Sequence, residues 1–137
     1  MQKAKGRKNG TLVFVAYKTY THSAEDSMID WSRVATLREE IGAEDFDDVV
    51  ELFLEEVDAA VDELAAQQHD NDLESKLHFL KGSALSLGFQ SFSELCQAGE
   101  KTAAMNQDTI IDLQEILHCY TQSRTVFVND LPDKMAG

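Results

Sequence analysis

Residues 77–100 read LHFLKGSALSLGFQSFSELCQAGE, and this stretch decides the fold. On an α-helix of 3.6 residues per turn, its first half and the residues just before it place apolar side chains at alternating steps of four and three. These side chains are Leu73, Leu77, Leu80, Ala84 and Leu87. The spacing predicts an amphipathic helix that buries one stripe against neighbouring helices.

The side of this helix away from the stripe carries His78 and Gly82. At 100° per residue, His78 lies roughly 140° from the centre of the stripe and Gly82 lies on the far side, so both are expected to face solvent. Glycine in a helix interior costs about 1 kcal/mol relative to alanine, and helix packing cannot explain it at an outward position. We therefore expect something outside the domain to need this bare patch. Lys81, three residues after His78, can bring its ammonium to a group that the imidazole carries.

A lone exposed histidine on a helix is most often an ordinary surface residue, so its position alone is weak evidence of function. The charges around it are stronger evidence. Residues 75–93 contain no aspartate or glutamate, although acids are frequent elsewhere, and they include Lys76 and Lys81. A site that accepts an anion would be kept clear of acids in this way. The pattern indicates an anion-accepting site around His78 with no acid nearby.

The same residues resemble the signature of the histidine phosphotransfer (HPt) domain family, roughly H-x-L-K-G-S-S-x-x-L-G followed by a cysteine or alanine and a glutamate on the next helix. The matching positions are His78, Leu80, Lys81, Gly82, Ser83, Leu87, Gly88, Cys96 and Glu100. The family often has a second serine, a leucine and a larger apolar residue where this sequence has Ala84, Phe92 and Gly99. The last departure bears on how tightly the next helix packs. The resemblance covers residues 28–131.

The resemblance implies that the chain is a phosphoryl carrier. His78 would accept a phosphoryl group from the aspartate of one receiver domain, on the ring nitrogen far from the backbone, and pass it to another receiver. Lys81 would add positive charge, and the receiver would bring Mg²⁺, so no cofactor of the chain's own is expected. The expected docking surface around the histidine comprises Phe79, Gly82, Ser83 and Leu85.

Three functions fit these observations. The first is a free-standing relay intermediate whose partners are response-regulator receiver domains and a hybrid histidine kinase. The second is a phosphoacceptor domain used directly by a histidine kinase, and the third is a helical interaction module in which His78 is never phosphorylated. The chain has the length of one domain with no kinase or receiver attached, which favours the first function.

Composition restricts the remaining chemistry. The chain has 137 residues, 43% of them hydrophobic, and a single proline, which predicts one helical domain. It has neither a G-x-x-x-x-G-K-[ST] loop nor a G-x-G-x-x-G motif, so we expect a carrier without an ATP site and not an enzyme. Cys96 and Cys119 lack C-x-x-C spacing, and Glu115 with His118 is an isolated Glu-x-x-His pair, so no metal site is expected.

The net charge of -13 is unevenly distributed. Residues 1–27 carry five bases against two acids, whereas residues 28–137 carry seven bases against 23 acids, a net charge of -16. The first segment is expected to be a flexible basic tail, and the second an acidic domain that does not bind nucleic acid. No run approaches the roughly 18 apolar residues that span a bilayer, and the cysteine usage suits a reducing compartment. We expect a cytoplasmic monomer away from the membrane.

Hydrophobic periodicity predicts five helices. Their expected ranges are 30–41, 44–67, the segment between Asn71 and Gly88, 89–105 and 109–129. Asp30 is expected to cap the first helix, and Asn71 with Glu74 the central one. Ile110 is expected in the core and Pro132 at the end of the last helix. Four long helices with short connections imply an all-α, antiparallel four-helix bundle with the short additional N-terminal helix across one end.

Overall fold

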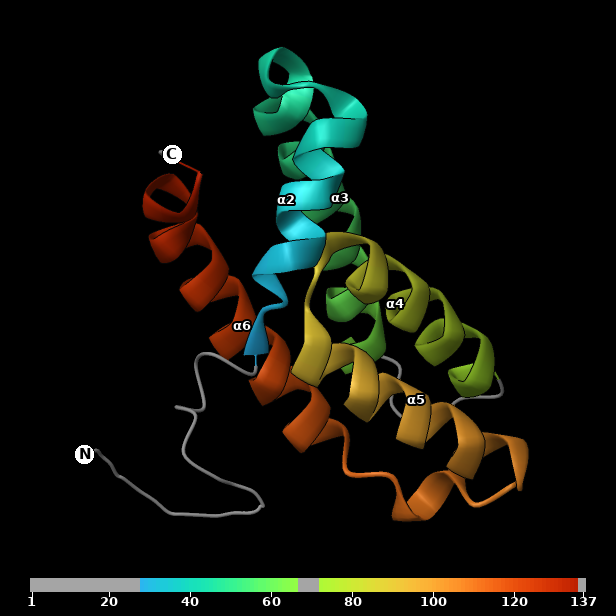
Figure 1. The fold of residues 1–137 in the computed structure, drawn as a ribbon. Coiled ribbons are helices and arrows are strands. Elements are labelled where there is room, and N and C mark those ends of the chain that lie inside the picture. The colour runs from blue at the N-terminus through green and yellow to red at the C-terminus, as the bar shows by residue number, and fades with distance from the viewer. Residues whose placement is uncertain (1–27, 67–71, 136–137) are drawn as a thin grey trace, which may run out of the picture.

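The computed structural model of the protein describes residues 28–66 and 72–135 (Figure 1). Its helices are α2 (Trp31–Ile41), α3 (Ala43–Ala66), α4 (Leu73–Leu87), α5 (Gln90–Ala104) and α6 (Leu113–Lys134), with a 3-10 turn, η1, at Asp108–Ile110. The described part contains no β-strand, and Ile29 and Phe89 form an isolated β-bridge. The predicted all-α class is confirmed. The predictions for residues 1–27 and for a cap at Asn71 lie outside the described residues.

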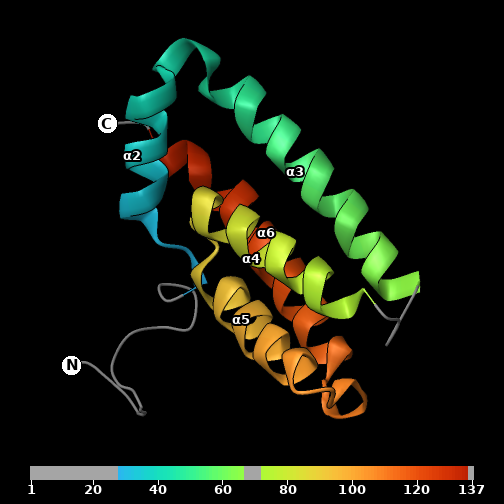
Figure 2. The same ribbon diagram turned by 90° about the vertical axis from the view of Figure 1, so that its right-hand side faces the viewer.

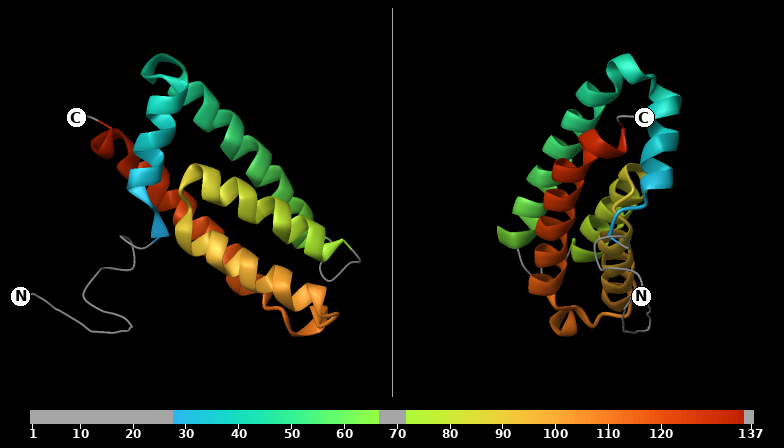
Figure 3. Two further views of the ribbon diagram at one scale, coloured as in Figure 1. Left: turned by 45° about the vertical axis from the view of Figure 1, so that its right-hand side comes forward. Right: turned by 60° about the vertical axis from the view of Figure 1, so that its left-hand side comes forward.

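The four helices α3 to α6 run alternately in opposite directions and form an antiparallel bundle (Figures 1 and 2). α3 and α6 have 24 and 22 residues, whereas α4 and α5 have 15 residues each. The two longer helices therefore extend beyond the α4–α5 turn, and α2 packs at this end of the bundle (Figure 3). The predicted arrangement of a short helix across one end of four long ones is confirmed.

Contacts with two other parts of the bundle hold the N-terminal end of α2 in place. The Asp30 side chain accepts a hydrogen bond from the Arg33 N–H, so Asp30 is the N-cap that the sequence predicts. The Asp30 N–H donates to the Gly88 carbonyl at 2.7 Å. The Trp31 ring stacks on Phe127 of α6, with the ring centroids 5.8 Å apart. α2 therefore ties the α4–α5 turn to the last helix.

Asp58 joins α3 to α6 beside a buried aromatic cluster. Its carboxylate accepts hydrogen bonds from the Tyr120 hydroxyl and from Arg124, whose Nε and Nη2 lie at 3.0 and 2.9 Å. Burial raises the pKa of Asp58, but the hydrogen bonds from Arg124 and Tyr120 outweigh it and lower the pKa below its ordinary value. The Tyr120 ring packs on Phe89 and Phe92 in the core. These contacts fix the register of α3 against α6.

Two glycines shape the α4–α5 hairpin. Gly88 ends α4 in the left-handed conformation at φ +87°, and a Cβ there would lie 2.9 Å from the Asp30 carbonyl oxygen. At Gly99, on the inner side of α5, a Cβ would lie 2.9 Å from Leu77 Cδ1 and 3.4 Å from Ile116 Cδ1. The departure from the family pattern at Gly99 therefore permits a close approach of α5 to α4.

The last helix begins one turn later than the sequence predicts. Ile110 lies in η1 and is 70% exposed, so the expectation that it is a core residue of a helix over 109–129 is wrong. α6 begins at Leu113, which is buried, and the Asp112 side chain caps it by accepting a hydrogen bond from the Glu115 N–H at 3.1 Å. The cap and the buried leucine together set the later start.

The last helix also continues through Pro132 to Lys134, and the expectation that Pro132 ends it is wrong. Proline removes one hydrogen bond from a helix and crowds the preceding turn. The final turn compensates, because Leu131 and Met135 pack against the core and the Met135 N–H donates to the Leu131 carbonyl at 3.0 Å. Lys134 Nζ also lies 5.7 Å from the centroid of the Trp31 ring. Tertiary contacts therefore outweigh the local preference of proline.

Candidate functional site

α4 buries the stripe that its sequence predicts and exposes the opposite side. The buried residues are Leu73, Leu77, Leu80, Ala84 and Leu87. The His78 side chain is 67% exposed, Leu85 is 56% exposed, and a Cβ at Gly82 would have no atom within 4 Å. We call His78, Gly82 and Leu85 the outer ridge of α4. An imidazole on this ridge, with bare backbone one turn away, is accessible to another protein.

Glu100 of α5 bridges His78 and Lys81. Its Oε2 lies 2.8 Å from His78 Nδ1, and its Oε1 lies 2.8 Å from Lys81 Nζ. α4 and α5 are antiparallel neighbours, which brings together residues that are 22 positions apart in the chain. The expectation that no acid lies near His78 is therefore wrong, because the acid-free segment ends at residue 93 and the carboxylate comes from further along the next helix. Glu100 stands in the family signature, and that was the signal that could have revealed it.

The protonation of Glu100 determines which ring nitrogen of His78 is reactive. Hydrogen bonds from Lys81 and, to a smaller extent, from His78 lower the pKa of Glu100 below its ordinary value. An ionised carboxylate only accepts hydrogen bonds, so the hydrogen-bond partner assigns the ring hydrogen to Nδ1. In the neutral imidazole, Nε2 then carries the free electron pair. The arrangement leaves Nε2 free as a nucleophile, and the hydrogen bond between Nδ1 and Glu100 fixes the orientation of the ring.

The positive charge at the site comes from Lys81. Lys81 lies one turn along α4 from His78, and its side chain is 24% exposed. Its ammonium forms an ion pair with Glu100 of α5. A cation at this place favours a group that brings negative charge to the imidazole. The three side chains together suit the transfer of an anionic group to and from His78.

A scan against protein-family models matches residues 48–131 to the Hpt domain. The chain belongs to the Hpt domain family. The matched region contains the outer ridge of α4, Lys81 and Glu100. No curated protein and no solved structure matches the chain. Hpt domains serve histidine phosphotransfer in two-component phosphorelays and interact with receiver domains and kinases.

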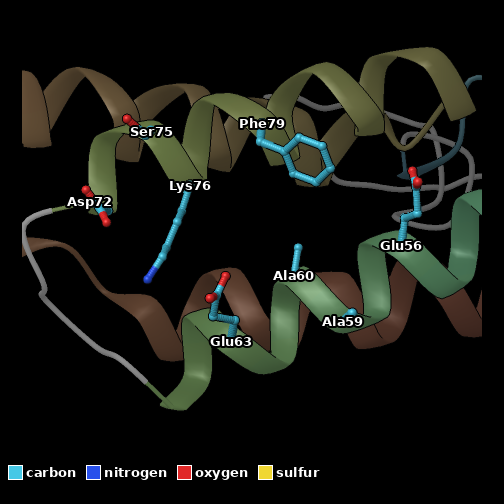
Figure 4. Close-up of a pocket in the computed structure, with 8 residues that line it drawn as sticks. All are labelled: Glu56, Ala59, Ala60, Glu63, Asp72, Ser75, Lys76 and Phe79. Carbon is cyan, nitrogen blue, oxygen red and sulfur yellow. The ribbon is translucent and has the colours of Figure 1, made fainter.

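The other docking residues that the sequence predicts lie around His78 in this Hpt domain. Phe79 is 48% exposed and projects from α4 toward α3 (Figure 4). Ser83 is half-buried on the same helix. Gly82 and Leu85 belong to the outer ridge, so the structure groups all four residues around the imidazole, on the ridge and on its α3 flank. Their role in docking stays a prediction.

The remaining candidate residues lie elsewhere in the Hpt domain. Cys96 is a buried core residue, and burial raises the pKa of its thiol to about 12. Cys119 is also buried and free. Within residues 28–66 and 72–135, no group of histidine, cysteine and acidic side chains could hold a metal ion. None of the helices in this part combines the length and apolar character that crossing a bilayer requires.

Proposed function

We propose that this Hpt domain is a phosphorelay intermediate that accepts a phosphoryl group on Nε2 of His78 from one receiver and passes it to another. The observation that carries the proposal is the contact of Glu100 with His78 and Lys81 beside the bare backbone of Gly82. An exposed histidine alone would be unremarkable on a helix surface. A histidine with one nitrogen fixed, the other free and a cation nearby is arranged for nucleophilic attack.

In the forward step, the electron pair of His78 Nε2 attacks phosphorus while the bond from phosphorus to the receiver's aspartate oxygen breaks. The aspartate leaves as a carboxylate, and the imidazole ring gains positive charge as the new N–P bond forms. Glu100, 2.8 Å from Nδ1, compensates that charge. Lys81 attracts the phosphoryl oxygens, and the receiver supplies Mg²⁺ for the same purpose. In the onward step, a carboxylate oxygen of the second receiver's aspartate attacks phosphorus, and the N–P bond breaks with its electron pair returning to Nε2.

A receiver must bring its aspartate close to the imidazole for this in-line transfer. Gly82 leaves open space one turn from His78, and Leu85 and Phe79 offer apolar contacts on either side. Ser83 can add a hydrogen bond from the edge of this surface. We place the exchange in the cytoplasm, where thiols such as those of the free Cys96 and Cys119 stay reduced.

The test is transfer of radiolabelled phosphoryl from a phosphorylated receiver to the Hpt domain and its variants. The label should be labile in acid and stable in alkali, absent in His78→Gln and retained in His118→Gln, which removes another exposed helical histidine. Label that persists in His78→Gln would exclude the proposed acceptor. Receiver transfer that is slower than direct labelling by a kinase lacking its receiver would favour the kinase-substrate alternative.

A further inference from the structure

An open groove lies between α3 and α4 (Figure 4). Glu100 belongs to α5 and contacts α4 from its other flank. Its volume is about 620 Å³. Ala59 and Ala60 of α3 and Phe79 of α4 give it an apolar lining, and Phe79 is half exposed. An aromatic ring left half in water beside two alanines is a surface that another protein can cover. We call this feature the α3–α4 groove.

The same groove is predominantly acidic. Glu56 and Glu63 of α3 and Asp72 before α4 line it, with Lys76 as the basic residue among its lining side chains. The negative electrostatic field extends beyond the groove, because α3 carries ten acids and no lysine or arginine in its 24 residues. A cationic partner would be attracted along the whole helix.

The groove is continuous with the surface that a receiver must cover. Phe79 follows His78 directly, and it projects from α4 into the groove (Figure 4). A protein that brings an aspartate to His78 therefore also covers Phe79. A second copy of this chain is a poor occupant, because it would bring two acidic α3 helices together.

We propose that the α3–α4 groove selects the receiver, by taking an apolar side chain from a receiver segment that also carries lysine or arginine. This inference rests on the proposed function and names the chemistry of its partner. The apolar side chain covers Phe79 and the two alanines, and the basic residues face Glu56 and Glu63. Charge attraction of this kind raises the rate of association and discriminates against acidic partners more than it raises affinity. The α5 flank of His78 performs the chemistry, and the α3 flank selects the partner.

The experiment compares two pairs of charge reversals on α3. The groove variant is Glu56→Lys with Glu63→Lys, and the control is Glu55→Lys with Asp62→Lys. Both pairs are exposed, seven residues apart and equal in charge change, but only the first lines the groove. Each protein is first phosphorylated on His78 with phosphoramidate, and transfer to a panel of receiver domains from the source organism is expressed per labelled molecule at several salt concentrations.

With the receiver that accepts phosphoryl fastest from the parent protein, kcat/KM should fall about tenfold in the groove variant and less than about twofold in the control. The parent rate should fall with added salt, and the groove variant should lose most of that dependence. Phe79→Ala should lower kcat/KM without changing the salt dependence. The preferred receiver should carry lysine or arginine beside an exposed apolar residue near its aspartate.

Several results would overturn the inference. Equal losses in the two charge variants would show a general effect of net charge, and parental rates in the groove variant would show that the groove is not covered. A dimer that Phe79→Ala disperses, or nuclear Overhauser contacts of Phe79 with residues 11–20, would assign the groove to a second copy or to this chain's own N-terminal segment. Failure of His78 to take phosphoryl from phosphoramidate would instead refute the proposed function.

Discussion

A glycine lies in a helix interior at each side of α4: Gly99 belongs to α5, which packs on the inner side of α4, and Gly82 belongs to the outer ridge of α4 itself. The two glycines have different causes. The buried Leu77 side chain fills the space that a Cβ at Gly99 would need, whereas the space around a Cβ at Gly82 is open. Each glycine costs about 1 kcal/mol in helix propensity. Packing within the molecule accounts for Gly99. Nothing in the described part of the chain accounts for Gly82, which is why a partner must.

The two sides of α4 are linked through Glu100. It follows Gly99 in the chain, so the close approach that Gly99 permits also brings the Glu100 carboxylate to His78 and Lys81. The close packing of α5 against α4 is therefore required for the contacts that Glu100 makes with His78 and Lys81. Substitutions at the two glycines can separate these contributions.

The largest effect is expected from Gly99→Leu. A leucine there would displace the Leu77 side chain, and overpacking of this kind costs about 3 kcal/mol of unfolding free energy. Urea unfolding followed by circular dichroism measures the loss. Gly82→Leu is the matched control and should be at least as stable as the parent protein, because its side chain enters open space. Equal destabilisation by the two leucines would show that the two sides of α4 do not differ.

A smaller effect, with opposite signs for stability and activity, is expected from Gly82→Gln. The free energy of unfolding should rise by up to about 1 kcal/mol, because a glycine leaves a helix interior. Transfer from a phosphorylated receiver should fall by about tenfold or more, because the new side chain stands in the gap between the two proteins. Both quantities can be measured on one preparation. An unchanged rate of phosphoryl transfer from the receiver would show that the partner does not dock on the outer ridge.

The smallest effect is expected on the stability of the protein at low pH. The pKa values of Glu100 and Asp58 are lowered in the folded protein, so both carboxylates bind protons more readily once the chain unfolds. Their contribution to stability is complete above about pH 5 and is lost as the pH falls through the folded values. Both groups are partly exposed, so solvent limits the size of the effect. Asp58→Asn should flatten the dependence of unfolding free energy on pH below about pH 5, and an unchanged slope would contradict this account.

The sequence predicts the parts of this molecule that depend on local periodicity. The stripe on α4, the exposure of His78 and the cap at Asp30 all follow from spacing along one helix. Glu100 was missed because its contact depends on how two helices pair across 22 residues. The course of α6 through Pro132 was missed for a similar reason, since contacts with α2 and the core hold its last turn.

The same limit explains why the α3–α4 groove was not foreseen. Periodicity assigns Ala60 to the inner side of α3 and Phe79 to the flank of α4, but it does not say how far apart the two helices stand. In the sequence alone, the many acids of α3 are typical of an ordinary solvated helix face. Only the distance between the helices turns that face into one wall of a groove.

The most direct test of the central claim is to locate the phosphoryl group within the His78 ring. The ¹⁵N-labelled protein would be phosphorylated and examined by NMR for coupling between phosphorus and each ring nitrogen. Because Glu100 holds the hydrogen on Nδ1, the account predicts phosphorus on Nε2 of His78, with Nδ1 still protonated and bonded to Glu100. Phosphorus on Nδ1, or on a histidine other than His78, would contradict it.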